Sequence, residues 1–217
     1  MKKHRFIPAA ALAAALVAAS AASAASADPG GKPLPPAQAQ ALIAAPAAVA
    51  SGSATRSVTG QEALAAASAA GAVVSVAPGL SLQQAVGLVP TPGGPTRRSY
   101  GARRASGYTA CSANSAWYEW GTWPYQQRIT DTTYWCAVYG ERITYTSSTS
   151  NGSGTFCSTS WTSSQLIGGG IGYSWFVTRS SAGFSCPTAI PWISLHPSHY
   201  EDVARNAWGS TALVGAS

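Results

Sequence analysis

The chain has 217 residues, of which 46% are hydrophobic and only 9% are charged, with a formal net charge of +6. So few charges exclude a charged coiled coil and also a classical disordered chain, which combines few apolar groups with many charges. Residues 99–217 carry six Arg against five acids, so most of the net charge lies in the first 98 residues. The sequence therefore lacks the dense Lys/Arg stripe on which nucleic-acid binding depends.

The first 27 residues are typical of a secretory signal peptide. A positive start (Lys2 to Arg5) precedes an apolar stretch (Phe6 to Val17), and Ala25-Ser26-Ala27 supplies small residues for cleavage. The apolar stretch is mostly Ala, which favours export and cleavage over a permanent membrane anchor. We therefore expect a mature chain that begins near Asp28 and is secreted, either to the extracellular space or to the cell surface.

Residues 28–98 differ in composition from the rest of the chain. They contain no Trp, Tyr, Phe or Cys, and they hold nine of the 14 prolines. A core needs large side chains to offset the loss of chain entropy, and this segment has few. The sequence predicts a low-complexity Ala/Pro-rich tail, either a spacer or a propeptide removed at Arg97-Arg98 or Arg103-Arg104. Helical stretches are expected within it at 60–71 and after Ser81.

Residues 99–217 hold all eight Trp, all nine Tyr and all four Cys, and they predict an all-β domain, a small disulfide-stabilised sandwich or barrel. The segment 133–139 is apolar on both faces, which is typical of a central strand covered on both sides. Gly140 permits a turn, and a hairpin turn is expected over 147–154, where Asn151-Gly152 is a strong signal. Further strands are expected at 108–113, 117–123, 142–146, 155–161, 172–179, 183–186 and 190–195.

One short C-terminal helix is expected after Ser198. Ser198 and Glu201 have the spacing of a capping box, Asp202 would complement the helix dipole, and Gly209 would end the helix. The apolar stripe that would lie on the sheet consists of Tyr200, Val203, Ala204, Ala207 and Trp208.

The four cysteines of an exported chain predict two disulfides. Of the three possible pairings we favour the sequential one, Cys111 with Cys136 and Cys157 with Cys186. The spacings contain no close C-x2-C pair, which argues against a zinc site. We accordingly expect no bound metal ion and no cofactor.

Candidates for catalysis are few. Glycoside hydrolysis would need two of the carboxylates Glu119, Asp131 and Glu141 across a cleft. The histidines of the domain, His196 and His199, come with no nucleophile motif, and their spacing is not that of a helical metal site. The sequence therefore favours a binding protein over an enzyme, and we assign no catalytic residue.

The strongest functional signal is a run of aromatic residues, Trp117, Tyr118, Trp120, Trp123 and Tyr125. Such rings either fill the core or form a platform that stacks on sugar rings. Together with many Ser, Thr and Asn and few charges, they favour a neutral polyol ligand.

The sequence thus predicts a secreted, non-catalytic module that binds an extracellular polysaccharide or cell wall. Its partners would be an extracellular polymer or a secreted protein, without nucleic acid and without stable membrane insertion. Two alternatives stay open. One is a structural or interaction protein of the cell surface, and the other is a small secreted hydrolase.

Overall fold

A computed structural model describes residues 48–90 and 108–217 of the chain. The predicted signal peptide at 1–27 and the paired arginines at 97–98 and 103–104 lie outside these residues. In the described part, no helix is long and apolar enough to cross a bilayer.

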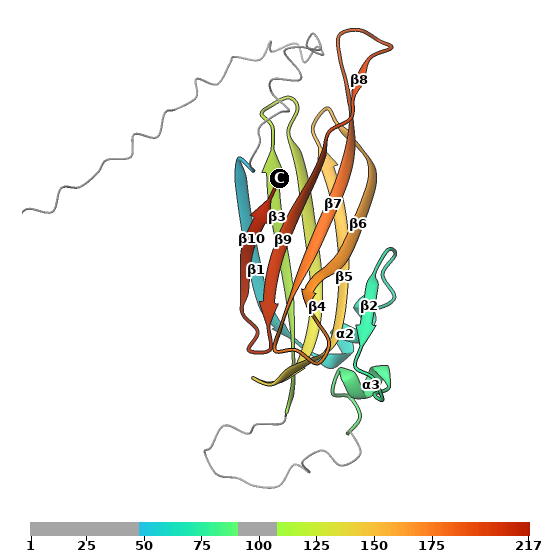
Figure 1. Ribbon diagram of the computed structural model, residues 1–217. Helices are drawn as coiled ribbons and strands as arrows, with labels where there is room; N and C mark the ends of the chain where they lie inside the picture. Colours follow the sequence, from blue (N-terminus) through green and yellow to red (C-terminus); the bar gives the residue numbers. More distant parts are fainter. Residues whose placement is uncertain (1–47, 91–107) are drawn as a thin grey trace, which may run out of the picture.

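Two antiparallel sheets pack face to face in an elongated sandwich (Figure 1), which confirms the predicted all-β class. The first sheet has the strand order β1-β3-β4-β5-β2. Its strands are β1 (Ala50–Val58), β2 (Val73–Val76), β3 (Thr109–Trp120), β4 (Gln127–Val138) and β5 (Arg142–Gly154). The second sheet has the order β10-β9-β7-β6, and β8 pairs with β7. Its strands are β6 (Ser158–Gly169), β7 (Trp175–Pro187), β8 (Ser194–Leu195), β9 (Ser198–Asn206) and β10 (Thr211–Ala216).

Residues 48–90 form part of the sandwich, although they lie within the segment 28–98 that the sequence predicts to be a spacer or propeptide. β1 pairs with β3 from Ala50 opposite Glu119 to Val58 opposite Cys111, and β2 extends the sheet beside β5. These residues need few large side chains of their own because β3, β4 and β5 supply the aromatic surface. The change of composition near residue 99 is therefore not an edge of the folded part.

Two short helices, α2 (Gly60–Ala66) and α3 (Leu82–Ala85), confirm the predicted helical stretches. Each begins with a capping box. The hydroxyl of the residue before the helix accepts a hydrogen bond from the backbone N–H three residues later, and the side chain of that later residue accepts one from the backbone N–H of the first. Their buried residues Ala63 and Ala85 pack in one cluster with the Cys111–Cys136 disulfide and Tyr145. The helices thus cover the outer face of the first sheet at one end.

β4 is the central strand that the sequence predicts. Trp135 and Ala137 pack toward the second sheet, while Cys136 packs on the opposite side beneath the helices. The hairpin turn predicted at 147–154 is wrong, because β5 continues to Gly154 and pairs with β4 throughout. Several of its hydroxyls find backbone partners inside the fold, so a polar run can continue as a strand. Ser147 Oγ donates to the backbone oxygen of Ala66 at 3.2 Å, and Thr149 Oγ1 donates to that of Thr132 at 3.3 Å.

The predicted C-terminal helix is also wrong, because residues 198–206 form strand β9 between β7 and β10. In a strand every second side chain points inward, and His199, Glu201, Val203 and Arg205 are the buried ones. The spacing of Ser198 and Glu201 fits a helix N-cap. The strand is favoured because it lets Arg205 bond to residues of both sheets.

Both predicted disulfides are present, with the sequential pairing. Cys111 and Cys136 lie directly opposite each other on β3 and β4. Cys157, just before β6, is bonded to Cys186 near the end of β7. The bonds close segments of 25 and 29 residues, and in the chain-entropy account each contributes about 3.5 kcal/mol.

Candidate functional site

The five aromatic residues predicted as a platform do not form one. Tyr118, Trp120 and Tyr125 are buried in the apolar cluster between the sheets. A buried ring cannot stack on a ligand, so the prediction is wrong for these three. Trp123 is exposed at the turn between β3 and β4, and Trp117 is partly exposed on the outer face of the first sheet.

Contacts within the protein occupy the ring of Trp117. It lies flat on Gly52 of β1, where a Cβ atom would come within 2.8 Å of the indole. The Arg128 guanidinium lies over the ring at 4.5 Å from its centroid, and Arg128 Nε donates to Glu119 Oε1 at 2.9 Å. Held between a glycine and a paired cation, the ring has little face left for a ligand.

Three other aromatic residues gather at one end of the sandwich, around a cleft of about 470 Å³. We call this the aromatic cleft: it lies among β1, β3, β4 and the turn between β9 and β10, and Tyr108, Tyr139 and Trp208 line it. These three side chains are between 36% and 52% exposed. The rings of Tyr108 and Tyr139 stack at 5.3 Å with an interplanar angle of 14°. The volume falls within the range of small-molecule binding sites.

The turn after β9 holds Trp208 in place. Asn206 Oδ1 accepts from the backbone N–H groups of Trp208 and Ser210, both at 3.0 Å. Gly209 follows with φ of 85°, a conformation that favours glycine. The indole packs against Gly140, where a Cβ atom would come within 3.1 Å of Trp208 Nε1. The ring is therefore positioned before any ligand arrives, which lowers the entropy lost on binding.

The floor and rim of the aromatic cleft are neutral. Trp135 is buried at the floor, and its Nε1 donates to the backbone oxygen of Asn206 at 3.0 Å. Thr55, Ser57 and Ser112 also line the cleft. Among its described lining residues Arg56 carries the only charge, and that guanidinium pairs with Glu62 at 2.7 Å. The cleft therefore offers aromatic faces and hydroxyl groups without an unpaired charge.

The centre of the sandwich contains a buried ion pair. Arg205 and Asp131 are both fully buried and lie 2.7 Å apart. Asp131 also accepts hydrogen bonds from Thr133, Thr178 and Ser180, at 2.6, 2.8 and 2.9 Å. Burial lowers the pKa of Arg205, and the Asp131 carboxylate opposes that shift. Arg205 Nε is buried without a hydrogen-bond partner. The network joins the two sheets and, because it is buried, is not placed to meet a ligand.

Glu201 lies in the same interior with neither carboxyl oxygen in a hydrogen bond of ordinary geometry. Burial raises its pKa to about 9, with a smaller contribution from the Asp131 charge. Glu201 is therefore protonated at neutral pH, and it does not line the aromatic cleft.

Two of the three carboxylates considered for hydrolysis are held in ion pairs, Glu119 with Arg128 and Asp131 with Arg205. A smaller cavity of about 280 Å³ lies beside Glu119, which is its one acidic lining residue among those described. The third carboxylate, Glu141, lines neither the aromatic cleft nor this smaller cavity. Retaining and inverting glycosidases both use two carboxylates flanking the bond, and neither cavity provides them.

His199 also has a structural position. Its ring stacks on Trp120 at 4.6 Å, its Nε2 lies 2.9 Å from Gln127 Oε1, and burial lowers its pKa. Within residues 48–90 and 108–217, no group of three His, Cys, Asp or Glu side chains is arranged to hold a metal ion.

Comparison with known proteins identifies no relative. No family model, no curated protein and no solved structure matches the chain. The function therefore has to be inferred from the geometry of the site.

Sequence reasoning missed the aromatic cleft because its three rings come from distant parts of the chain. The sequence pattern places Trp208 on the stripe of the expected helix and Tyr139 on one face of the expected strand. One local signal is present: Asn206 followed by Gly209 and Ser210 is typical of a tight turn, and Trp208 lies within it.

Proposed function

We propose that the protein is a secreted, non-catalytic module that binds a neutral polysaccharide, of the extracellular space or of a cell wall, through the aromatic cleft. The observation that carries this proposal is the gathering of three exposed rings above the buried Trp135, in a cleft without an unpaired charge. A sugar ring has apolar C–H faces and hydroxyl edges. Its faces would stack on Tyr139 or Trp208, while its hydroxyls would meet the hydroxyl groups of the rim.

The disulfides support the extracellular part of the proposal. All four cysteines of the chain are oxidised, and disulfides persist mainly in oxidising compartments. The signal peptide predicted at 1–27 agrees with that location.

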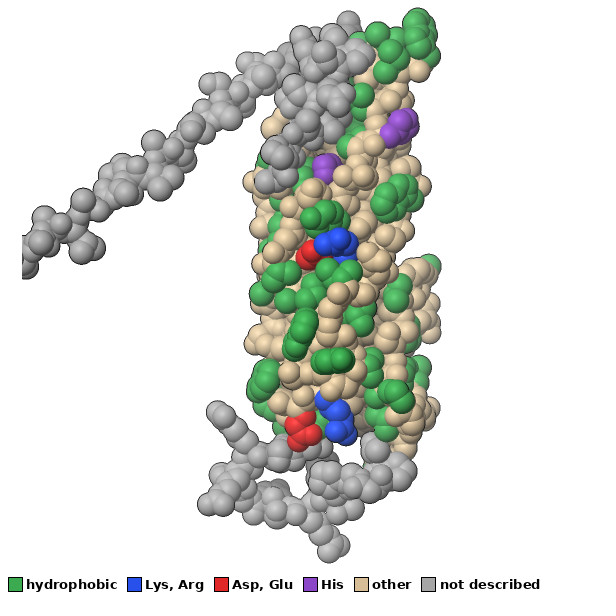
Figure 2. All heavy atoms as spheres, viewed as in Figure 1, with side chains coloured by type: hydrophobic (Ala, Val, Ile, Leu, Met, Phe, Trp, Pro, Cys, Tyr) green, Lys and Arg blue, Asp and Glu red, His purple; other side chains and the backbone are tan. Residues whose placement is uncertain are grey.

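The surface also favours a neutral ligand over an ionic one. In the view of Figure 2, charged side chains of the described residues occupy two small groups, and hydrophobic and uncharged polar atoms fill the rest of that face. That face has no broad positive potential to attract a polyanion.

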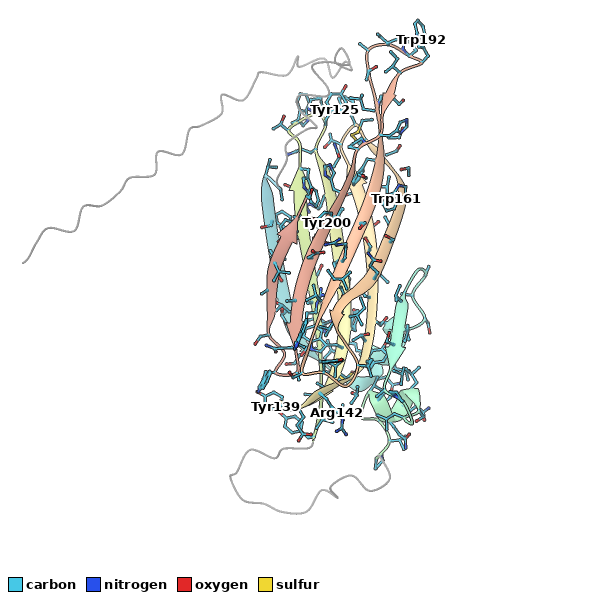
Figure 3. The ribbon with its side chains drawn as sticks, in the orientation of Figure 1. Tyr125, Tyr139, Arg142, Trp161, Trp192 and Tyr200 are labelled. Carbon is cyan, nitrogen blue, oxygen red and sulfur yellow. A yellow bond between two sulfur atoms is a disulfide. The ribbon has the colours of Figure 1, made fainter. Side chains whose placement is uncertain are left out.

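Retention on insoluble polymers tests the proposal. The purified protein is incubated with cellulose, chitin, mannan, starch and purified peptidoglycan in insoluble form, and with an anionic pectin immobilised on beads as a charge control. We expect retention on at least one neutral polymer or on peptidoglycan, and about tenfold weaker retention for Trp208→Ala, equivalent to about 1.4 kcal/mol. The matched control is Trp192→Ala, because Trp192 is 83% exposed and lies at the opposite end of the sandwich from Tyr139 (Figure 3).

Two results would overturn the proposal. One is retention on none of these polymers, or on pectin alone. The other is an equal effect of the Trp208 and Trp192 variants, because the cleft would then have no special part in binding.

A further inference from the structure

Three tryptophans of the outer faces share one arrangement. Each ring lies against a glycine of a neighbouring strand, Trp117 on Gly52, Trp161 on Gly183 and Trp175 on Gly168. For Trp161 the fit is closest, since a Cβ atom on Gly183 would come within 2.1 Å of the indole Nε1. Trp161 and Gly183 are also directly opposite each other in the register of β6 and β7. The glycine allows the indole to lie flat on the sheet.

Trp161 differs from Trp117 in what covers it. Arg128 lies over the Trp117 ring, whereas no cation and no second ring of the described residues contacts Trp161. Trp161 is 49% exposed although one side of its ring rests on the sheet. It therefore presents a flat aromatic face to solvent.

Serine hydroxyls surround this face. Ser163 follows Trp161 on the same side of β6, and its partner on β7 is Ser181; Ser185 and Ser198 lie on the same side of β7 and β9. The nearest charged group in this register is the Arg179–Asp202 pair, closed by two hydrogen bonds of 2.8 and 2.7 Å. Figure 3 shows Trp161 on β6, away from the end that carries Tyr139.

We propose that Trp161 is a second binding position, at which a sugar unit of a neutral polysaccharide stacks on the indole and its hydroxyls bond to the surrounding serines. This inference rests on the proposed function, because it assigns the same class of ligand. Its neutral surroundings match an uncharged polyol and give no counter-charge for a phosphate or an acidic peptide. Two positions on one domain raise retention on a repeating polymer by multivalency, without tight binding at either one.

The experiment compares Trp161→Ala with Trp117→Ala on the polymer that retains the wild-type protein. Both variants remove a tryptophan packed on a glycine, so a purely structural role predicts that any change in retention follows the loss of unfolding free energy in each variant. We expect retention to fall about tenfold for Trp161→Ala and to be unchanged for Trp117→Ala, whose ring is already covered.

A second variant keeps the tryptophan and covers it. Ser163→Glu with Ser181→Arg places an acid–arginine pair beside Trp161 with the register that Glu119 and Arg128 have beside Trp117, two residues beyond the aromatic residue. The new arginine would lie on the strand that carries Gly183, whereas Arg128 lies on the strand away from Gly52. We expect this protein to fold and to lose retention as Trp161→Ala does. Retention equal to wild type in both Trp161→Ala and the double variant would overturn the proposal.

The outcomes separate this inference from the aromatic cleft. If Trp208→Ala weakens retention and Trp161→Ala does not, the cleft stands and the second position fails. If only Trp161→Ala weakens it, the second position stands and the cleft fails. If Trp161→Ala changes the sedimentation of the protein but not its retention, Trp161 lies in a contact between two copies of the protein. That result would also contradict the proposal.

Discussion

The centre of the sandwich and the end that holds the aromatic cleft are built in opposite ways. At the centre, Asp131, Glu201 and Arg205 are completely buried, although such residues are almost always at the surface. At the cleft, Tyr139 and Trp208 are exposed, although large aromatic side chains stabilise a fold most when they are buried.

This difference separates stability from binding. The buried polar network takes Asn114 and Asp131 from the first sheet and Thr178, Ser180 and Arg205 from the second, so it depends on both sheets packing in one register. The exposed rings of the cleft contribute less to folding, because much of their surface stays in water. Substitutions at the centre should therefore change unfolding, and substitutions at the cleft should change binding.

Among substitutions compared at one neutral pH, the largest loss of stability is expected from Asp131→Ala. Removing this carboxylate leaves Arg205 buried and unpaired, and breaking a buried pair in this way costs about 3–5 kcal/mol. Denaturant unfolding followed by circular dichroism measures the loss. Glu119→Ala is the control, because it breaks a pair with Arg128 that is partly exposed and should cost only about 0–1 kcal/mol. Equal, small losses for the two variants would show that the buried network has no special role.

A somewhat smaller loss is expected when the disulfide away from the cleft is removed. Cys157→Ser with Cys186→Ser opens a segment of 29 residues, and the unfolding free energy should fall by about 3.5 kcal/mol. Neither cysteine lines the aromatic cleft, whereas Cys111 does. Under conditions where the variant is folded, its retention on the polysaccharide should match that of the wild type. If the folded variant lost retention as well as stability, stability and binding would not depend on separate parts of the molecule.

Glu201 gives the centre a pH dependence. Its pKa in the folded protein, about 9, is above its unfolded value of 4.5, so its contribution to stability is complete below pH 4.5. The contribution is lost as the pH rises toward 9, by up to about 1.4 kcal/mol per pH unit. Glu201→Gln should remove this slope, so that the variant equals the wild type in acid and exceeds it in mild base.

Unfolding curves collected across this pH range check the prediction. Glu62→Gln is the control, because Glu62 is exposed and the Arg56 guanidinium lowers its pKa, the opposite direction. Parallel stability profiles for the wild type and Glu201→Gln would contradict the account of Glu201.

The smallest effect concerns salt. Because the described lining of the aromatic cleft has no unpaired charge, added sodium chloride should change retention on the polysaccharide by less than about twofold. Retention measured at low and high ionic strength tests this. A steep decrease with salt would indicate electrostatic binding elsewhere on the protein.

The sequence predicts local features of this fold better than distant ones. The all-β class and the central position of the strand at 133–139 follow from alternation and from the spacing of turn residues. The sequence leaves three disulfide pairings open, and the favoured one, the sequential pairing, is confirmed. The segment after Ser198 was mistaken for a helix because Glu201 fits a cap locally. Only the opposite sheet reveals that Glu201 and Arg205 are interior residues.

The same limit applies to the candidate site. Aromatic density correctly suggests that some rings lie outside the core, but it cannot tell which ones. Trp120 is buried because it meets His199, 79 positions later in the chain, and Trp208 is exposed because a turn places it against Gly140. Both facts depend on strand order, which the sequence does not reveal locally.

A double variant of the cleft, Tyr139→Ala with Trp208→Ala, decides whether the aromatic cleft binds the polymer when its retention is measured beside its unfolding free energy. Binding at the cleft predicts that retention on the neutral polysaccharide falls by much more than about tenfold, while the unfolding free energy changes by less than the loss expected for Asp131→Ala. Undiminished retention in a folded double variant would contradict it.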